Sequence, residues 1–591
     1  GGASGATLQQ CILSNNTASG EGGGASGGSL ENVLVVDNQA DYGGGVARAA
    51  LTNVTVAYNQ AAQSGGGTYR GTAFNSILFF NSAGASWSNY FNTICQYCCT
   101  TPDPQSTGNV TNDPLFADAA GGIYRLQGGS PAVDSARDAG VMVDLLGVLR
   151  PLPGTLGGTP VPDMGAYEYT VAHYVAPDGG HAWPFLTWTD AANDLQTAID
   201  AADPGDAVLV SNGVYNTGGR TYLGDLTNRV VIDKPLRMEA VHGHAVTIIE
   251  GSGPVGDSAV RGVYLGTNAA LIGFTIRNGA TRMAGDALRE QSGGGIFAES
   301  VGLVSNCVVA SCSANVCGGG VLGGRTVNSF LNANAASQGG GLALGEIAFS
   351  TVTGNHATDG GGTFGGTGQY SIIYFNTASG VGPNILGGTW NTCCSIPDPG
   401  GVGNITNSPA LLVTNDYLLA PDSPCIDAIA PVAGLLSRDL DGIPRPLDGD
   451  ANGTAGFDIG ACEHVHETAD TDGEGLSDED EISVYGTNPL LRDSDGEGQS
   501  DRDEIIAGMD PLDPASFFAI LDQAVGLEGQ IFSWPGRSGR LYTVIFTENP
   551  AGTWSNRLDY TDYPGINGLM SFTNDLPEHI GLYGVRVRLA P

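Results

Sequence analysis

The chain has 591 residues, of which 92 are glycine, 41% are hydrophobic and only 14% are charged. This composition supplies a large core and many turns but few of the charged residues that cover helices, so it excludes an all-helical protein. The 61 acidic and 23 basic residues give a net charge of −38, which argues against binding to nucleic acid or to anionic membranes. The sequence holds no run of about 18 apolar residues, so we expect no transmembrane segment.

Glycine triplets recur every 21 or 22 residues, apart from one step of 25, in two stretches of the chain. They begin at Gly22, Gly43 and Gly65, and again at Gly293, Gly318, Gly339 and Gly360. An Asn-x-Ala step precedes most triplets, and a short β-forming run such as Val33–Val36 precedes each Asn. This period is too short for a propeller blade and lacks helical periodicity. It predicts a parallel β-helix with one repeat per coil.

Four asparagines, Asn38, Asn59, Asn334 and Asn355, hold the same place in successive periods. Coils of a β-helix stack about 4.8 Å apart. The side-chain amides would therefore form a ladder and hydrogen-bond from coil to coil. We expect these asparagines to be buried and structural, while the glycines allow the positive φ that a tight bend requires.

A longer repeat encloses the coils. Ser76–Asn81 (SILFFN) returns 295 residues later as Ser371–Asn376 (SIIYFN). Further pairs are Cys98-Cys99 with Cys393-Cys394, Ser130–Asp134 with Ser423–Asp427, Arg150–Leu152 with Arg445–Leu447, and Asp163–Glu168 with Asp458–Glu463. The duplication predicts two tandem β-helix units, at residues 1–172 and 173–466.

The second unit has an entrance that the first lacks. Leu195, Ala198, Ile199 and Ala202 share one face of a short predicted helix, which Pro204-Gly205 ends. This helix would cap the first coil of the unit. The first unit begins directly in coil sequence, so we expect that about 120 residues are missing before Gly1 or that another molecule covers this end.

The chain combines NxAxxGGG coils with Asp113–Leu115 (DPL), Ser130–Asp134 (SPAVD), Arg150–Leu152 (RPL) and Asp163–Glu168 (DMGAYE). This combination resembles the secreted bacterial proteins called choice-of-anchor Q domain proteins. The resemblance covers roughly residues 1–466 and is specific in combination. It implies a right-handed parallel β-helix of the pectate-lyase superfamily, exported to a cell surface, without a common set of catalytic residues.

Two acidic loops follow. Residues 470–481 (DTDGEGLSDEDE) return 23 residues later as 493–504 (DSDGEGQSDRDE), and both fit the twelve-residue calcium loop D-x-D-x-x-G-x5-E. Oxygen ligands at this spacing select Ca²⁺. The expected ligands are Asp470, Asp472, Glu474, the Leu476 carbonyl, Asp478 and Glu481 in the first loop, and Asp493, Asp495, Glu497, the Gln499 carbonyl, Asp501 and Glu504 in the second.

The flanking segments Gly486–Leu490 (GTNPL) and Met509–Pro514 (MDPLDP) make the module at 467–514 resemble bacterial thrombospondin type 3 repeats. Glu474 and Glu497 depart from that pattern, because Asp or Asn is usual there, and the longer side chain is expected to weaken calcium affinity. A solvated acidic linker is the alternative, although random acidity would not repeat both the Gly and the Glu positions.

Alternating strands such as Leu541–Thr547 and Tyr583–Leu589 predict a small antiparallel, sandwich-like β domain at 515–591. Trp534 and Trp554 in this domain would either pack in the core or bind sugar. The predicted fold class is therefore all-β: two β-helix units, a calcium-loop module and a small antiparallel domain.

Eleven cysteines favour an oxidising compartment and leave one cysteine over after pairing. Cys425 and Cys462 appear together in the second unit, where the first has Ala132 and Tyr167, and we predict that they form a disulfide. The connectivity of Cys98-Cys99 and Cys393-Cys394 stays open.

No catalytic set is evident. The duplicated carboxylates and arginines are the best candidates for a hydrolase or lyase, but turn and cap hydrogen bonds explain them equally well. They are Asp134/Asp427, Asp144/Asp439, Asp163/Asp458, Glu168/Glu463 and Arg150/Arg445.

The sequence therefore favours an extracellular or cell-surface structural or adhesive protein stabilised by calcium. Its expected partners are further copies, joined head to tail into a filament, or a cell-surface polysaccharide. A polysaccharide lyase or glycoside hydrolase on a β-helix scaffold is the alternative.

Overall fold

The computed structural model describes residues 1–84, 87–119, 122–146, 148, 150–152, 160–412, 417–432, 435–526, 529–547, 554–557, 560–574 and 582–590. About 4% of the residues are helical, and the strands form a parallel β-solenoid of about 17 turns and a small antiparallel region near the C-terminus. The all-β, β-helical prediction is confirmed. Contacts divide the chain into two compact units, one of residues 1–409 with 432–436 and one of residues 410–431 with 437–591. The bounds of the four predicted domains stay predictions.

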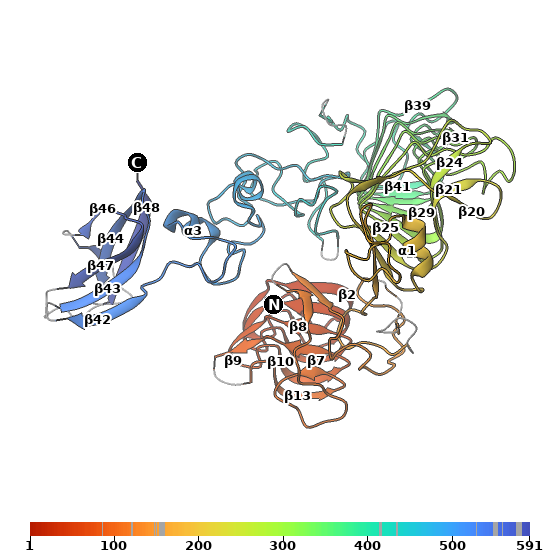
Figure 1. The fold of residues 1–591 in the computed structure, drawn as a ribbon. Coiled ribbons are helices and arrows are strands. Elements are labelled where there is room, and N and C mark those ends of the chain that lie inside the picture. Colours follow the sequence, from red (N-terminus) through yellow and green to blue (C-terminus); the bar gives the residue numbers. More distant parts are fainter. Residues whose placement is uncertain are drawn as a thin grey trace. The chain divides into compact units, whose positions relative to one another are not determined.

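The first β-helix is built from two parallel sheets (Figure 1). The larger contains β1 (Ala3–Ser4), β2 (Thr7–Ser14), β4 (Ala25–Ser26), β5 (Ser29–Val36), β7 (Val46–Thr52), β8 (Thr55–Ala57), β10 (Thr68–Phe74), β11 (Ile77–Phe79), β13 (Tyr90–Gln96) and β14 (Cys99–Thr100). The smaller contains β3 (Thr17–Glu21), β6 (Gln39–Tyr42), β9 (Gln60–Ser64) and β12 (Ser82–Ala83). Thr55 pairs with both Leu34 and Ile77, so one coil takes 21 or 22 residues, as the glycine spacing predicts.

The apolar run in β5 is buried on both of its faces. Side chains alternate along a strand, and Val33 and Val35 belong to the cluster inside the coil. Leu34 and Val36 belong to a second cluster, which includes Met164 of the segment that follows the coils. A strand covered on both sides is continuously hydrophobic rather than alternating.

The predicted asparagine ladder is confirmed in both β-helices. The side-chain amide of Asn38 donates to Asn59 Oδ1, and Asn334 donates to Asn355 Oδ1, both over 2.9 Å. All four side chains are at most 1% exposed. The ladders continue beyond these residues, through bonds from Asn16 to Asn38, Asn59 to Asn81, Asn81 to Asn89, Asn355 to Asn376 and Asn376 to Asn384.

The middle glycine of each triplet allows neighbouring coils to approach closely. A Cβ atom at Gly44 would lie 2.1 Å from the carbonyl oxygen of Gln60 in the next coil. The preceding Gly43 has a φ of +63°, in the left-handed region that glycine adopts without strain. The triplet thus combines a tight bend with a close backbone contact.

The segment after the first coils folds back along the outside of the β-helix and contains the antiparallel pair β15 (Phe116–Asp118) and β16 (Ile123–Leu126). The backbone N–H of Ala166 donates to the Thr55 hydroxyl over 3.0 Å, and that of Gly165 donates to the Asn75 carbonyl over 2.8 Å. These bonds fix the segment against two successive coils.

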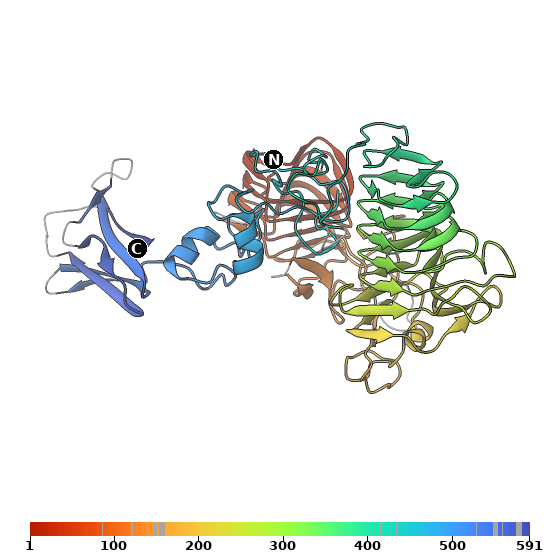
Figure 2. The same ribbon diagram turned by 90° about the horizontal axis from the view of Figure 1, so that it is seen from above.

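The coils of the second β-helix stack along one axis (Figure 2). Its largest sheet contains β17 (Ala172–Val175), β18 (Ala207–Val210), β20 (Arg220–Thr221), β21 (Thr227–Ile232), β22 (Arg237–Ala240), β24 (Val260–Leu265), β25 (Ala270–Ile272), β27 (Ile296–Ser305), β29 (Val321–Val327), β32 (Leu342–Ala343), β33 (Glu346–Ala348), β36 (Thr363–Phe364), β37 (Thr367–Gln369), β40 (Ile385–Leu386) and β41 (Thr389–Asn391). A second sheet contains β19 (Gly213–Tyr215), β23 (Thr247–Glu250), β26 (Thr275–Arg277), β28 (Val308–Ala310), β30 (Phe330–Asn332), β34 (Thr351–Thr353) and β38 (Ile372–Ile373), and a third contains β31 (Ala335–Gln338), β35 (His356–Asp359) and β39 (Thr377–Ala378).

Helix α1 (Leu195–Ala201) is the predicted cap of the second β-helix. Asp194 caps its N-terminus by accepting a hydrogen bond from the Thr197 backbone over 2.9 Å. Leu195, Ala198 and Ile199 are buried and join the core cluster that continues through the coils. The predicted apolar face is thus the one that packs.

The second compact unit holds the acidic module and the C-terminal domain. The module contains α2 (Asp478–Asp480), a π-helical turn η1 (Glu481–Tyr485) and α3 (Asp501–Ala507). The domain contains one sheet of β42 (Asp522–Gly526), β43 (Gly529–Gly536) and β47 (Gly568–Asn574), and another of β44 (Arg540–Thr547), β45 (Ser555–Asn556), β46 (Tyr563–Pro564) and β48 (Leu582–Leu589). Trp534 is fully buried in the core that the sheets share, whereas Trp554 is 39% exposed.

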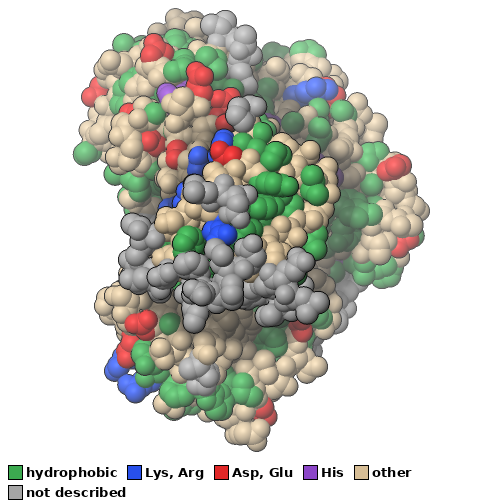
Figure 3. Space-filling view, turned by 90° about the vertical axis from the view of Figure 1, so that its left-hand side faces the viewer, with side chains coloured by type: hydrophobic (Ala, Val, Ile, Leu, Met, Phe, Trp, Pro, Cys, Tyr) green, Lys and Arg blue, Asp and Glu red, His purple; other side chains and the backbone are tan. Residues whose placement is uncertain are grey.

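The face shown in Figure 3 carries mainly hydrophobic and uncharged side chains, with scattered acidic groups and several lysine or arginine side chains. Among the described residues, no helix is long and apolar enough to cross a membrane.

Candidate metal centre

The two acidic loops have the same local geometry at their first position. Both oxygens of Asp470 accept backbone N–H groups of its own loop, from Gly473 and Gly475 over 2.9 Å. Asp493 does the same with Gly496 and Gly498 over 2.7 Å. Bonds to successive backbone amides wrap each loop around its first aspartate.

The sixth position of each loop requires glycine. Gly475 has a φ of +101° and Gly498 a φ of +107°, both in the left-handed region. The sharp turn predicted from the motif is therefore present in both loops.

Both loops end on a fully buried glutamate that has open oxygens. Glu481, where η1 begins, and Glu504, in α3, are each 0% exposed. Oε2 of Glu481 and both oxygens of Glu504 lack a hydrogen-bond partner in the described structure. The Oδ2 atoms of Asp472 and Asp495 are buried and unpartnered as well. Burying a charged oxygen without a partner costs several kcal/mol, and a cation bound by these atoms would offset that cost.

The electrostatics of the loops support this interpretation. Burial, together with the nearby Asp472 and Glu474, raises the pKa of Glu481 to about 8. Burial and Asp495 likewise raise the pKa of Glu504 to about 8. Residues 470–504 include 13 acidic and 2 basic side chains, a net charge of −11. Such a cluster is self-repulsive until a cation neutralises it.

The ninth position differs in role from the other predicted ligands. Both oxygens of Asp478 accept bonds from Thr471, through its backbone N–H over 2.8 Å and its hydroxyl over 2.7 Å. Asp501 binds Ser494 in the same way and over the same distances. The structure therefore gives these two aspartates a bracing role across the loop.

The remaining predicted ligands lie within or beside the loops. The ligand atoms of Asp493, Asp495 and Glu497 lie within 4.8 Å of one another. Leu476 is half-buried just before α2, and the side chain of Gln499 exchanges hydrogen bonds with the backbone of Phe518 over 2.7 and 3.1 Å.

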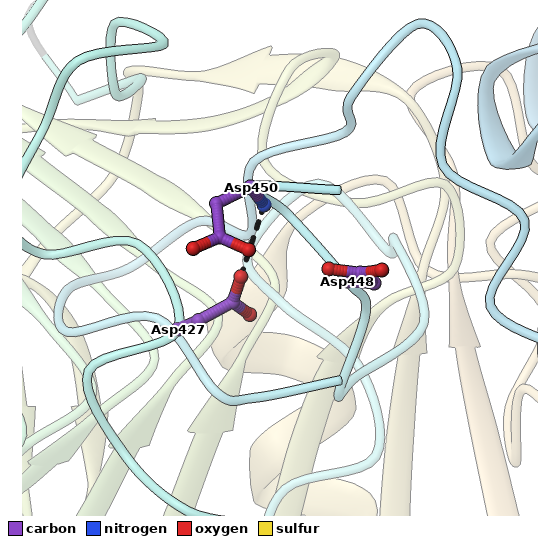
Figure 4. Close-up of side chains that lie close together, drawn as sticks. All are labelled: Asp427, Asp448 and Asp450. Atoms are coloured by element: carbon purple, nitrogen blue, oxygen red, sulfur yellow. Dashed lines mark hydrogen bonds between the residues drawn. The ribbon is translucent and has the colours of Figure 1, made fainter. Parts of the chain in front are cut away.

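A third carboxylate group, Asp427, Asp448 and Asp450, was not recognised in the sequence (Figure 4). Asp448–Gly453 has the spacing D-x-D-x-N-G, and Asp448 accepts the backbone N–H groups of Asn452 and Gly453 over 3.0 and 2.8 Å. Asp427 accepts the Asp450 N–H over 3.0 Å. Because Asp450 is exposed and the twelfth position of this loop is Ile459 rather than a buried glutamate, we assign no ion to this group.

The duplicated carboxylates of the first unit form a closed latch. Arg150 donates to the Asp163 carbonyl over 2.8 Å and to the Gly165 carbonyl over 3.1 Å, and its Nε lies 3.2 Å from Glu168 Oε2. Glu168 also accepts the backbone N–H groups of Leu152 and Asp163. Burial raises the pKa of Glu168 to about 7, against the lowering effect of Arg150.

Asp144 completes the latch by accepting the backbone N–H groups of Leu146, Val148 and Glu168 over 2.8 to 3.0 Å. The second β-helix unit of the sequence duplication repeats this arrangement with Asp427, Asp439, Arg445, Asp458 and Glu463. The latch side chains Asp144, Arg150, Asp163 and Glu168 are at most 3% exposed. Their bonds to the backbone are those of a structural element.

A cavity of about 520 Å³ lies in the first compact unit, beside this latch. Arg125, Arg237, Asp144 and Glu168 line it, together with apolar side chains. Arg237 is paired with Glu239, but its buried Nε has no hydrogen-bond partner in the described structure. Burial and the charge of Arg125 lower the pKa of Arg237 to about 10. The cavity therefore offers guanidinium groups, while its carboxylates are already bonded.

Ten of the eleven cysteines are buried, and Cys11 is half-buried. Cys98 lies in the core inside the first β-helix and Cys99 in the outer cluster, so adjacent cysteines face opposite sides of the strand. The disulfide between Cys425 and Cys462 stays a prediction.

No known protein family matches the chain, and no curated protein matches it. The chain is similar to a solved structure described as "Crystal structure of pectate lyase Pel9A", with 15% sequence identity over 50% of this chain and 96% of that chain. The TM-score is 0.26. A likeness at this level carries no argument about activity, and the β-helical fold rests on the strand pairing described above.

Proposed function

We propose that the protein is a calcium-stabilised β-helix scaffold of the cell surface or extracellular space, with a structural or adhesive role. The observation that carries the calcium assignment is the pair of fully buried glutamates, Glu481 and Glu504, which have unpartnered oxygens and lie near other carboxylates of their loops. Carboxylate-rich twelve-residue loops with a terminal glutamate match the ligand chemistry of Ca²⁺.

Calcium titration calorimetry on the whole chain tests the proposal. We expect about two ions per chain, and Glu481→Gln and Glu504→Gln should each abolish or strongly weaken one of the two binding events. Glu479→Gln is the matched control, because it removes the same charge from an exposed position beside Glu481. No calcium uptake by the native chain, or an equal loss in the control, would refute the assignment.

The structural role is supported by the way the molecule uses its polar groups. The asparagine ladders and the latch carboxylates are buried and bonded within the fold. Most of the polar and charged residues that the repeats mark as candidates thus form hydrogen bonds that stabilise the scaffold. A surface location is tested by adding protease to the medium of intact source cells. If the chain stays intact until the cells are lysed, a surface location is contradicted.

The alternative is a protein that binds or cleaves an anionic polysaccharide in the cavity beside the first latch. Arg125 and Arg237 favour a ligand that carries carboxylate or sulfate groups. The test is incubation with acidic polysaccharides, followed by measurement of binding and of chain cleavage. Binding that Arg237→Met abolishes would favour this alternative, and cleavage would establish an enzyme.

We also propose that copies of the chain associate head to tail into a filament, with the C-terminal domain of one copy docking on the first β-helix of the next. Each coil of a β-helix presents strand edges that another strand can pair with. Light scattering in calcium, with and without residues 517–591, tests this docking. A chain that remains monomeric at high concentration would exclude the filament.

A further inference from the structure

Glu474 reaches out of its own loop to the second one. Its Oε2 accepts the backbone N–H of Arg502, 28 residues further along, over 2.9 Å. It also forms a hydrogen bond with the side chain of Ser500. Both partners lie at the start of α3, the helix that carries Glu504. A side chain of the first loop therefore holds the N-terminal end of a helix of the second.

The other oxygen of Glu474 remains with the first loop. Glu474 is 7% exposed, and its Oε1 is buried without a hydrogen-bond partner in the described structure. The backbone N–H of Glu474 donates to Asp470 and Asp472 of the same loop over 3.1 and 3.0 Å. One carboxylate thus lies between the first group of ligands and α3.

Glu497, the equivalent residue of the second loop, behaves differently. Its Oε1 accepts the backbone N–H of Gln499 over 2.8 Å, within its own loop. The two glutamates have the same length and sequence position but different partners. The link between the loops is therefore specific to Glu474.

A second contact supports the link. The side chain of Arg502 packs over the turn of the first loop, so that a Cβ at Gly475 would lie 2.9 Å from Arg502 Cδ. The two loops therefore form one packed body.

We propose that Glu474 is a positioning residue that couples the two calcium sites. An ion in the first loop fixes the Oε1 side of the carboxylate, and the Oε2 side then holds α3 with Glu504 in place for a second ion. Occupancy of the first site raises the affinity of the second, and by thermodynamic reciprocity the second raises that of the first by the same factor. This inference rests on the proposed calcium binding.

Shortening the Glu474 side chain to aspartate gives the most direct test. Glu474→Asp restores the residue usual at this loop position but withdraws the carboxylate from Arg502. Glu497→Asp is the matched control, because it shortens the equivalent side chain without a link to lose. In calcium titrations of the full chain, we expect cooperative binding in the native protein and in Glu497→Asp. In Glu474→Asp we expect independent binding, with second-site affinity reduced about 5- to 150-fold, the usual range of such coupling.

Glu474→Gln separates coupling from folding. The amide keeps an oxygen that accepts the Arg502 N–H but loses the charge, so we expect a weaker first site with cooperativity retained. Independent binding of two ions by the native chain, or the same change in Glu474→Asp and Glu497→Asp, would overturn the inference while leaving calcium binding intact. Absence of calcium binding in the native chain would instead refute the proposed function itself.

Discussion

A ladder asparagine serves three coils at once. The amide of Asn59 donates to the carbonyls of Val35 and Ala57 and to Asn81 Oδ1, over 2.8 to 2.9 Å. Its oxygen accepts both the backbone N–H and the side-chain amide of Asn38. Every polar atom of this fully buried side chain is thus bonded within the stack.

We predict that Asn59→Ala destabilises the first β-helix by several kcal/mol, because it leaves several buried donors and acceptors unpaired at about 1–3 kcal/mol each. Asn16→Ala is the control, since Asn16 is only half-buried and makes fewer bonds, and it should cost less. Urea denaturation followed by circular dichroism measures both. Equal and small effects would mean that the ladder adds little stability.

The latch arginine provides a second prediction. Removing Arg150 leaves Glu168 without its cation in a buried site, so Arg150→Met should cost about 3–5 kcal/mol of unfolding free energy. The comparison is Arg48→Met, which breaks an exposed pair with Glu21 and should have no measurable effect. Chemical denaturation of both variants checks this, and an Arg150→Met protein as stable as the native one would show that the latch is dispensable.

At the residue scale, sequence reasoning succeeds where a role follows from repetition. The phase of the Asn positions is sufficient to predict the ladder, because every coil places them at the same turn. The partners of Glu474 and of the latch are set by segments that meet only in the folded chain, as in the bond from Glu168 to Leu152. The D-x-D-x-N-G spacing at Asp448–Gly453 has no copy in the other unit, so repetition does not distinguish it from an ordinary turn.

At the scale of elements, α1 closes the second β-helix in the manner that its apolar spacing predicts. Leu195, Ala198 and Ile199 lie at helical spacing and share a core with strands of the first coils. Without such a cover, the apolar side chains of the first coil would face water. The helix is therefore part of the hydrophobic core.

We predict that Ile199→Ala lowers the unfolding free energy by about 2–5 kcal/mol, through lost burial and the cavity it leaves. Asp200→Ala on the same helix is the control, because Asp200 is exposed and pairs with the partly exposed Arg220. Thermal denaturation distinguishes them. A smaller loss in Ile199→Ala than in Asp200→Ala would contradict the capping role.

Coil boundaries were predictable because one period corresponds to one coil, whereas the segment after the first coils was not. Residues 113–170 carry no repeat within the unit, and their path depends on bonds such as that from Ala166 to Thr55, 111 residues away. Periodicity contains no information about contacts of this kind. The repeat pattern around Thr55 therefore does not predict that Ala166 packs against it.

At the scale of the whole molecule, the two compact units differ in what stabilises them. Both contain a latch, but the stacked coils and the asparagine ladders lie in the first. The second contains the acidic loops and the antiparallel domain with Trp534 at its core. A ligand that binds only native loops stabilises only the unit that holds them.

Differential scanning calorimetry should therefore show more than one transition, of which calcium shifts one. At a free calcium concentration of 100 times the dissociation constant, the stabilisation is about 2.7 kcal/mol per site. In the Glu481→Gln/Glu504→Gln double variant, calcium should move no transition. A calcium-dependent shift of every transition would indicate that the units unfold together.

The ladder also restricts how this protein can change in length during evolution. In the coils that carry the ladder, strand partners stand 21 or 22 residues apart, and each asparagine bonds to the next one up the stack. In the early coils of the second β-helix, Val230 pairs with Val263 and Val263 with Ile296, so extra residues between strands leave the pairing in register. An insertion within a strand would instead displace the later amides from their neighbours and expose inward-facing side chains. Lengthening is therefore tolerated in the connections between strands or as duplication of a complete coil, as in other solenoids.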